Sequence, residues 1–361
     1  MAQRRDNHNP MSTYDRIASL PVEIDGYQLS PLAAEIAAGM TRSCTLVSLS
    51  GGGLEGVGED VVYSPEAHAE FQRVGIRGEI AGRWTLGEFC DHVEQLDLLL
   101  NTPELETFRL YRIWALHSAA LDLALRQAGL SLAAALGRHP APMRYVASLR
   151  LGEPPTLEPV LTRLKLDPQL HFKLDATSAW TPDLIASLVA TGAVEAIDFK
   201  GLYRGNLVEQ RADPLLYQRV VDAFPLAWLE DPDLSDPAAA AVLADHHDRI
   251  TWDVPIHSIA DIEQLPFRPR MVNLKPSRIG RLQQLLATYD YCDSERIGMY
   301  SGGQTELGPG RGQAQYLAAL FHPDTPNDLA PAGYNSPQPP AGLPTSPLIA
   351  DLTAPGFRWP Q

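Results

Sequence analysis

Four short apolar runs each end in a charged residue: AIDFKG (196–201), LAWLEDP (226–232), ITWDVP (250–255) and VNLKPSRIG (272–280). Each run has apolar or β-branched residues followed by a turn signal, which predicts a buried β-strand. In a chain that alternates strands with helices, such a charge lies at the mouth of a barrel or sheet. The charged residues are Asp198, Glu230, Asp253 and Lys275. Three carboxylates followed by a lysine predict a divalent metal beside a base.

The alternation of strands and helices extends from Met143 to about residue 333. The first two strand-like segments are RYVASLRL and HFKLDA, the last two are IGMYSG and NDLAP, and helical segments separate the strand-like ones. The count is eight strands, whose carboxyl ends are roughly 22 to 32 residues apart, as in a (β/α)8 barrel. N-cap residues stand before four of the helices, at Thr181, Asp213, Asp236 and Ser258. We therefore predict a modified TIM barrel of the α/β class over residues 143–333.

The chain before the barrel has a different pattern. SCTLVSLS and GLEGVGED, separated by glycines, predict a β-hairpin, and residues 103–137 are helical in periodicity. This predicts an α+β capping domain over residues 15–138. Residues 1–14 are polar and are expected to be a disordered tail. Residues 334–361 are rich in proline and glycine, which predicts an extended C-terminal segment that packs on the cap.

The composition excludes some classes of function. The net charge of −15 argues against a general nucleic-acid-binding protein, which carries a basic surface. The polar start has no apolar signal core, and no apolar run reaches transmembrane length, so no membrane partner is expected. Cys44, Cys90 and Cys292 lie far apart without CxxC spacing, which indicates a reduced protein. We expect a cytoplasmic protein that acts on a small molecule.

The carboxylates at the strand ends are the candidate metal ligands. Carboxylates gathered on one rim repel one another unless a cation balances them, and Mg²⁺ prefers oxygen ligands. We therefore expect Mg²⁺ to bind to Asp198, Glu230 and Asp253. A lysine in a desolvated site beside a dication has a lowered pKa and can act as a base. Lys275 is the candidate for this role.

Four further residues are candidate substrate contacts. Lys200 follows the third strand, and His257 follows the fifth strand in PIHS. Gln304 and Glu306 lie in GGQTELGPGRG, after the seventh strand. That loop is rich in glycine but lacks P-loop spacing, so it gives little support for a phosphate site.

The order and spacing of these motifs resemble the enolase superfamily, in the branch of mandelate racemase and muconate-lactonizing enzymes. GLEGVGED is similar to the GxGE hairpin of that branch, and residues 115–138 are similar to its "AALDLAGKALGLPLYELLG" segment. YVASL, LAWLEDP and NLKPSRIG are similar to its first, fourth and sixth barrel strands. Residues 301–322 resemble its seventh strand and the helix that follows. The resemblance covers most of the chain.

Two strand ends depart from the pattern of the branch. The branch carries KxK at the second strand, whereas this chain reads KLD, so Lys173 matches the first lysine and Asp175 replaces the second. The third strand carries DAN in the branch, and Lys200 stands here in place of the Asn. Because LDATSAW also resembles "VDANQGW", an alternative alignment makes Asp175 the first metal ligand; we prefer Asp198, which keeps one ligand per strand. No histidine ends the seventh strand, so the His–Asp base of mandelate racemase is absent.

The resemblance implies a Mg²⁺-dependent enzyme that removes the proton α to a carboxylate of a small organic acid through an enediolate. With Lys275 as the base, Lys173 as an electrostatic partner and Asp175 as an acid, the leading expectation is a lyase of the dehydratase type. One alternative is a racemase, epimerase or cycloisomerase in which Lys173 is a second base. Another is a degenerate barrel that only binds an acid. A homo-oligomer is expected.

Overall fold

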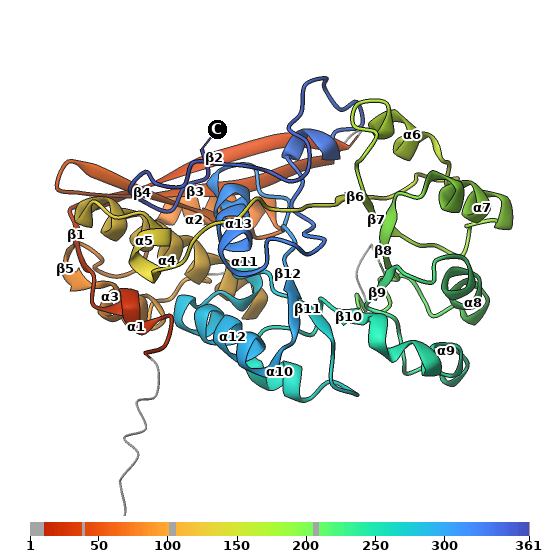
Figure 1. The fold of residues 1–361 in the computed structure, drawn as a ribbon. Coiled ribbons are helices and arrows are strands. Elements are labelled where there is room, and N and C mark those ends of the chain that lie inside the picture. The colour runs from red at the N-terminus through yellow and green to blue at the C-terminus, as the bar shows by residue number, and fades with distance from the viewer. Residues whose placement is uncertain (1–10, 38–39, 101–105, 205–208, 361) are drawn as a thin grey trace, which may run out of the picture.

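The chain folds as an N-terminal domain beside a barrel. The computed structural model describes residues 11–37, 40–100, 106–204 and 209–360 of the 361. In Figure 1 the N-terminal domain, coloured red to yellow, lies mainly on the left, the green barrel helices α6 to α9 lie on the right, and the cyan helices α10 and α12 lie below the centre. Among the described residues, no helix is both long and apolar enough to cross a membrane.

The N-terminal domain is built on an antiparallel sheet of three strands in the order β2 (Gly26–Ala37), β3 (Met40–Gly51) and β4 (Leu54–Asp60). β3 and β4 form the hairpin that the sequence predicts. The long helix α4 (Glu106–Ala128) packs against β4. The remaining elements are β1 (Pro21–Ile24) paired with β5 (Gly82–Thr85), α1 (Asp15–Ala18), α2 (Pro65–Val74), α3 (Leu86–Val93) and α5 (Leu132–Leu136).

Glycines allow α4 to approach β4 closely. A Cβ added at Gly58 would lie 2.0 Å from the Ala115 carbonyl oxygen and 2.5 Å from the Ser118 hydroxyl, both on α4. Gly56, two residues earlier on β4, faces the same helix: a Cβ added there would lie 2.2 Å from the Ala119 carbonyl oxygen. The GxG spacing of GLEGVGED therefore has a packing reason.

We expect Gly58→Ala to lower the free energy of unfolding by about 3 kcal/mol, because an extra methyl group cannot fit without moving α4 away from β4. Urea unfolding followed by circular dichroism measures the change. Gly26→Ala is the matched control, because its added Cβ would meet only the Ser50 hydroxyl at 3.7 Å. Equal stability of the two variants would contradict the packing argument.

The barrel sheet has seven parallel strands in chain order: β6 (Ala147–Leu149), β7 (Phe172–Asp175), β8 (Val194–Asp198), β9 (Trp228–Glu230), β10 (Ile250–Trp252), β11 (Met271–Asn273) and β12 (Gly298–Tyr300). The eighth predicted segment closes the ring through two parallel bridges, Asn327 with Tyr145 before β6 and Asp328 with Gly302 after β12. The prediction of a (β/α)-barrel with an α+β cap is confirmed.

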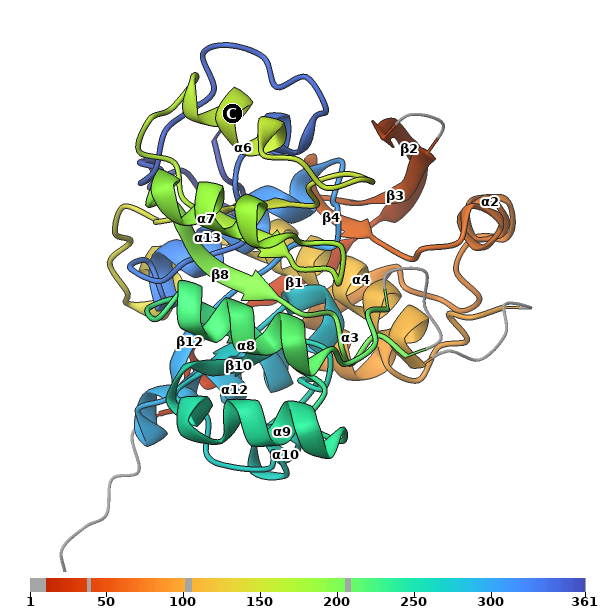
Figure 2. The same ribbon diagram turned by 90° about the vertical axis from the view of Figure 1, so that its right-hand side faces the viewer.

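Helices alternate with these strands: α6 (Glu158–Leu164), α7 (Pro182–Thr191), α8 (Pro214–Ala223), α9 (Pro237–Leu243) with η1 (Ala244–Arg249), α10 (Ile259–Glu263), α11 (Pro276–Ile279), α12 (Leu282–Glu295) and α13 (Pro309–Phe321). The four predicted N-cap side chains each accept a backbone N–H at a helix start. Figure 2 shows α7, α8 and α9 side by side on the outer face.

Both ends of the described chain pack on the folded domains. Thr13, in the tail expected to be disordered, is buried and donates from its backbone N–H to Asp290 (2.8 Å). The fold therefore begins before Asp15; residues 1–10 lie outside the described part. After η2 (Ala332–Asn335), the C-terminal segment reaches α4, where the Phe357 N–H donates to Asp122 (2.7 Å) and the Phe357 ring is fully buried.

A buried histidine joins the cap to the barrel. His117 of α4 accepts the N–H of Leu282 at Nδ1 (3.2 Å), and its Nε2 lies 3.2 Å from the Cys90 carbonyl, to which it donates in the neutral form. Burial lowers the pKa of His117 to about 3. The imidazole therefore stays neutral in the folded protein but gains a proton on unfolding below about pH 6.5.

We expect His117 to make the protein less stable as the pH falls. A basic group whose pKa is lower in the folded protein than in the unfolded chain stabilises the folded protein fully at pH values above its pKa in the unfolded chain. That contribution is lost as the pH falls toward its pKa in the folded protein. Between pH 6.5 and 5 the loss is roughly 2 kcal/mol. Urea unfolding at both pH values measures this loss. Between pH 6.5 and 5 the free energy of unfolding should fall less in His117→Gln than in the wild type. The exposed His139→Gln should keep the wild-type difference; equal differences in all three proteins would exclude this role.

Candidate active site

The carboxyl ends of the barrel strands bring the predicted charged residues to one rim. In the parallel register, Asp175 of β7 pairs with Asp198 of β8, and Asp198 pairs with Glu230 of β9. Asp253 follows β10 directly and Lys275 follows β11 by two residues. Asp198, Glu230 and Asp253 are fully buried. The sequence places these residues on successive strands, and so does the structure.

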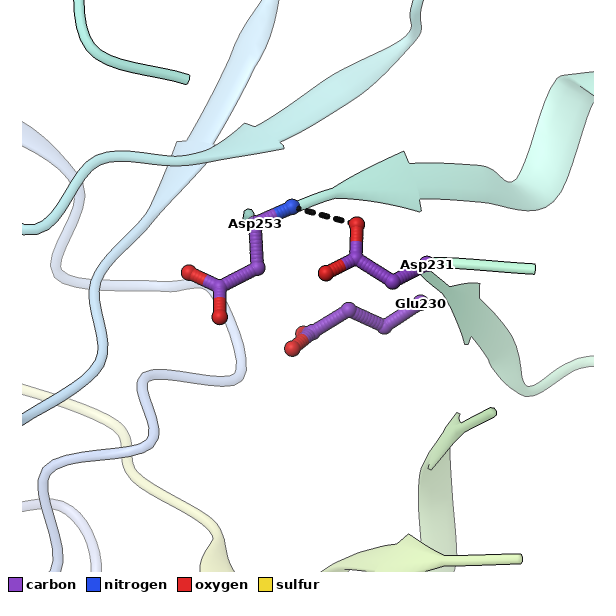
Figure 3. A group of neighbouring side chains, drawn as sticks. All are labelled: Glu230, Asp231 and Asp253. Carbon is purple, nitrogen blue, oxygen red and sulfur yellow. Dashed lines mark hydrogen bonds between the residues drawn. The ribbon is translucent and has the colours of Figure 1, made fainter. Parts of the chain in front are cut away.

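Three of the carboxyl groups lie close enough to share a metal ion. One oxygen from each of Glu230, Asp231 and Asp253 lies within 4.8 Å of the others. Figure 3 shows these side chains beside one another, with the Asp253 N–H donating to Asp231 (2.9 Å). Asp231 has a positive φ of 46°, which is uncommon outside glycine. This trio contains Asp231, whereas the trio predicted from the sequence contains Asp198.

Lys173 lies between the carboxylates of the third and fourth strands. Its Nζ bonds to Glu230 and lies 3.2 Å from Asp198 and 3.4 Å from Asp328. Burial opposes its charge, but these carboxylates outweigh burial and hold the pKa of Lys173 well above its usual value. Lys173 is therefore an ammonium that balances buried negative charge. On the other side of Glu230, the Tyr300 hydroxyl donates to its second oxygen.

Asp198 and Asp175 share a second lysine. The Lys200 ammonium bonds to Asp198 Oδ2 and lies 3.5 Å from Asp175 Oδ1. Burial raises the pKa of Asp175, and repulsion by Asp198 adds to this, while the two lysines oppose it. Lys200 therefore occupies the region between the second and third strands.

Asp253 is surrounded by cations and a phenol. Arg278 donates to Asp253 Oδ1 (2.5 Å), and Lys275 and the Tyr203 hydroxyl donate to Oδ2 at 2.9 and 2.7 Å. Burial lowers the pKa of Lys275, and Arg278 and Lys173 lower it further, against the attraction of Asp253. The pKa values of Lys275 and Lys173 are therefore shifted in opposite directions, and Lys275 loses its proton more readily.

The charges of the rim leave a negative excess. We define the rim cluster as six carboxyl groups and four cationic groups: Asp175, Asp198, Glu230, Asp231, Asp253 and Asp328 with Lys173, Lys200, Lys275 and Arg278. If every group is ionised, the negative charges exceed the positive charges by two, which is the charge of one Mg²⁺, an ion that prefers oxygen ligands such as carboxylates. Burial raises the pKa of Asp231 to about 7, and repulsion by Asp253 and Asp198 adds to this. The donor set and its charge therefore fit a divalent metal ion.

Three predicted substrate contacts make hydrogen bonds elsewhere in the described structure. His257 bonds within its own loop, with its N–H donating to Asp261 (3.0 Å). Gln304 accepts from the Tyr63 hydroxyl of the cap (2.9 Å). Glu306 accepts the Gln304 N–H (2.6 Å) and lies 3.7 Å from Arg311. The loop after β12 is therefore held against the cap.

Five members of the site were not among the predicted residues: Tyr203, Asp231, Arg278, Tyr300 and Asp328. Two had a signal in the sequence. Asp231 is the second acidic residue of LEDP, and Arg278 is in the KPSRIG string that marks the sixth strand. Tyr203 and Asp328 reach the site from a loop and from the closing segment, so periodicity gives no sign of them.

The barrel and its cap have the fold of solved enolase-superfamily proteins. Muconate cycloisomerase from Pseudomonas fluorescens matches with a TM-score of 0.63 and 18% identity, over 93% of this chain and 96% of that one. A dipeptide epimerase from Methylococcus capsulatus, complexed with Mg ion, matches with a TM-score of 0.64 and 18% identity, over 84% and 89%. At these identities the likeness shows the fold.

The chain belongs to the family described as domain of unknown function DUF8230, whose N-terminal domain matches residues 15–135 and whose C-terminal domain matches residues 139–336. Among curated proteins, o-succinylbenzoate synthase of Listeria innocua is 31% identical over 131 residues, which are 35% of this chain and 34% of that protein. The chain spans about a third or less of the length of the curated relatives it matches.

Proposed function

We propose that this protein is a Mg²⁺-dependent enzyme that removes the proton α to a carboxylate of a small organic acid. The observation that carries the proposal is the rim cluster, where buried carboxylates on adjacent strand ends lie beside a lysine of lowered pKa. The enolase-superfamily fold and the names of the similar proteins support it.

Glu230 and Asp253 would hold the ion, together with Asp198 or Asp231. When bound, Mg²⁺ balances the excess negative charge of the cluster and acts as a Lewis acid toward the carboxylate of the substrate. Tyr300 and Arg278 orient Glu230 and Asp253 through their hydrogen bonds. The same bonds fix the carboxyl groups before the substrate arrives, which limits the reorganisation that the reaction requires.

Lys275 accepts the α proton in this proposal. Its neutral amine is favoured by burial and by the nearby Arg278, and its bond to Asp253 fixes the position of Nζ. A base acts best when its pKa lies near the working pH, and burial shifts a lysine in that direction. Lys173 keeps its proton, because three carboxylates stabilise the ammonium.

One base and one opposing acid favour a lyase. Asp175 stands where the branch that the sequence resembles carries the second lysine of KxK, and burial raises the pKa of its carboxyl group, so it can return a proton to a leaving group. The alternative is a racemase, epimerase or cycloisomerase with Lys173 as second base, an alternative that the cycloisomerase and epimerase neighbours keep open. A second alternative is a barrel that binds an acid without catalysis.

The test combines metal binding with isotope exchange. The full chain is titrated with Mn²⁺ by electron paramagnetic resonance, and a library of acid sugars and N-acyl amino acids is incubated with Mg²⁺ in D₂O. We expect Mn²⁺ binding and metal-dependent α-deuteration or elimination in at least one acid. Elimination identifies the lyase, and exchange without elimination identifies the isomerase. Binding of an acid with neither metal binding nor exchange would support the degenerate barrel.

A further inference from the structure

Lys200 is bound to Asp198 by an unusual local geometry. The backbone N–H of Lys200 donates to Asp198 Oδ1 (3.0 Å), while its own ammonium bonds to Oδ2 of the same carboxylate. The φ angle of Lys200 is +52°, in the left-handed region that a lysine seldom adopts. Such strain persists only where the surroundings enforce it, and it is frequent at functional sites. One residue thus contacts both oxygens of a candidate metal ligand.

The surroundings confine the Lys200 ammonium to the inside of the site. It lies 4.9 Å from the centre of the Tyr203 ring and 3.5 Å from Asp175 Oδ1, and the side chain is 14% exposed. Tyr203 in turn donates to Asp253 (2.7 Å), so the ring connects Lys200 to the acidic trio. The ammonium therefore has two acceptors within reach: Asp198 on the metal side and Asp175 on the second-strand side.

An ammonium and a metal ion compete for the same carboxylate oxygen. Mg²⁺ sits about 2.0–2.1 Å from its ligand oxygens, and a lysine ammonium at hydrogen-bond distance from the same atom would repel it strongly in a desolvated site. Among the ion pairs of the described chain, Lys200 pairs with Asp198 and Asp175 and with none of Glu230, Asp231 and Asp253, the three that lie within 4.8 Å of one another.

We propose that Lys200 is a tethered competitor of the metal at Asp198, and that metal coordination by Asp198 moves the Lys200 ammonium toward Asp175. The inference rests on the proposed function, since it requires the metal site. It assigns a consequence to the presence of Lys200 beside Asp198: metal affinity is lowered, and occupancy of the metal site brings the ammonium closer to Asp175.

The test measures metal affinity directly. Lys200→Asn and Lys200→Met remove the ammonium, and Asn also tolerates the left-handed backbone. We expect the Kd for Mn²⁺, measured by electron paramagnetic resonance, and for Mg²⁺, measured by competition, to fall about tenfold in both variants. Lys165→Met is the matched control, because this lysine is 72% exposed and pairs only with Glu158 among the ion pairs of the described chain.

A double variant locates the competition. Asp198→Asn combined with Lys200→Met should show no gain in affinity over Asp198→Asn alone, because the ligand for which the two cations compete is gone. An unchanged Kd in both Lys200 variants, with metal bound by the wild type, overturns the inference and leaves the proposed function intact. Absence of metal binding in every variant overturns the metal site itself and the inference with it. A thermal shift on adding Mg²⁺ that is larger in Lys200→Asn than in the wild type supports the inference independently.

Discussion

We expect Lys275→Met to lower the rate of α-proton removal by about 10⁴-fold. Nζ of Lys275 is the basic nitrogen of the rim cluster whose pKa is lowered, whereas the carboxylates around Lys173 and Lys200 raise the pKa of each above its usual value. Removing Lys275 therefore removes the acceptor of the proton. Methionine fills much of the same volume, which matters because the Lys275 side chain packs against Gly302, where an added Cβ would lie 2.8 Å from Cε.

The measurement is deuterium incorporation at the α carbon of an acid that the wild-type protein exchanges or eliminates. Lys165→Met, at the surface, should behave as the wild type. Mn²⁺ should still bind, with an affinity no weaker than that of the wild type, because Lys275 bonds to the candidate ligand Asp253, so that loss of rate with retained metal binding assigns Lys275 to proton transfer. Retained exchange of one enantiomer in Lys275→Met would instead identify Lys173 as a base and would favour the isomerase.

The sequence alone was enough to predict the barrel and the positions of its main charges. Strand ends are local features: a short apolar run followed by a turn signal gives the carboxyl end of β8 at Asp198 and that of β9 at Glu230. The N-cap residues were equally local, since Asp213 and Ser258 each bond to backbone N–H groups two or three residues ahead. Short-range patterns therefore determined which residues meet on the rim.

Contacts between distant segments were not predictable in the same way. Contact of Gln304 and Glu306 with substrate stays a prediction, and periodicity gave no sign that the loop that carries them bonds to Arg42 and Tyr63 of the cap, more than 200 residues earlier in the chain. Asp231 follows the fourth strand, and its role depends on a left-handed backbone that turns its carboxyl group toward the Asp253 N–H. Both features follow from packing between elements and from backbone geometry, which hydrophobic periodicity does not encode.

The same limit applies to the choice between Asp175 and Asp198. One alignment made Asp175 the first metal ligand and another made it Asp198. The strand count favoured Asp198, which ends β8, the third barrel strand. The structure adds that Asp198 is fully buried beside Lys173 and that Asp175 lies beside Lys200 at the edge of the cluster. Metal binding by Asp198 stays a prediction, and the Asp198→Asn variant described above addresses it.

Glu230→Gln should weaken binding of Mn²⁺ by at least about 100-fold, because Glu230 is a ligand whether Asp198 or Asp231 is the third ligand beside it and Asp253. Burial raises the pKa of Glu230 well above its usual value, and Asp198, Asp253 and Asp231 add to this effect against the attraction of Lys173. The site therefore disfavours a negative charge on Glu230, and a glutamine amide is neutral and has nearly the same shape as a carboxyl group. For that reason the melting temperature without added metal should stay close to that of the wild type.

The two expectations for Glu230→Gln separate a metal ligand from a structural acid. Thermal unfolding with a chelator and with Mg²⁺ should show a metal-dependent rise in the melting temperature for the wild type and for the exposed Glu158→Gln control, whose side chain is 67% exposed. The rise should be absent in Glu230→Gln, since stabilisation by a ligand follows its affinity for the folded state. If Glu230→Gln binds Mn²⁺ within threefold of the wild type, Glu230 does not hold the metal, and Lys173 and Tyr300 are then its partners in a purely structural network.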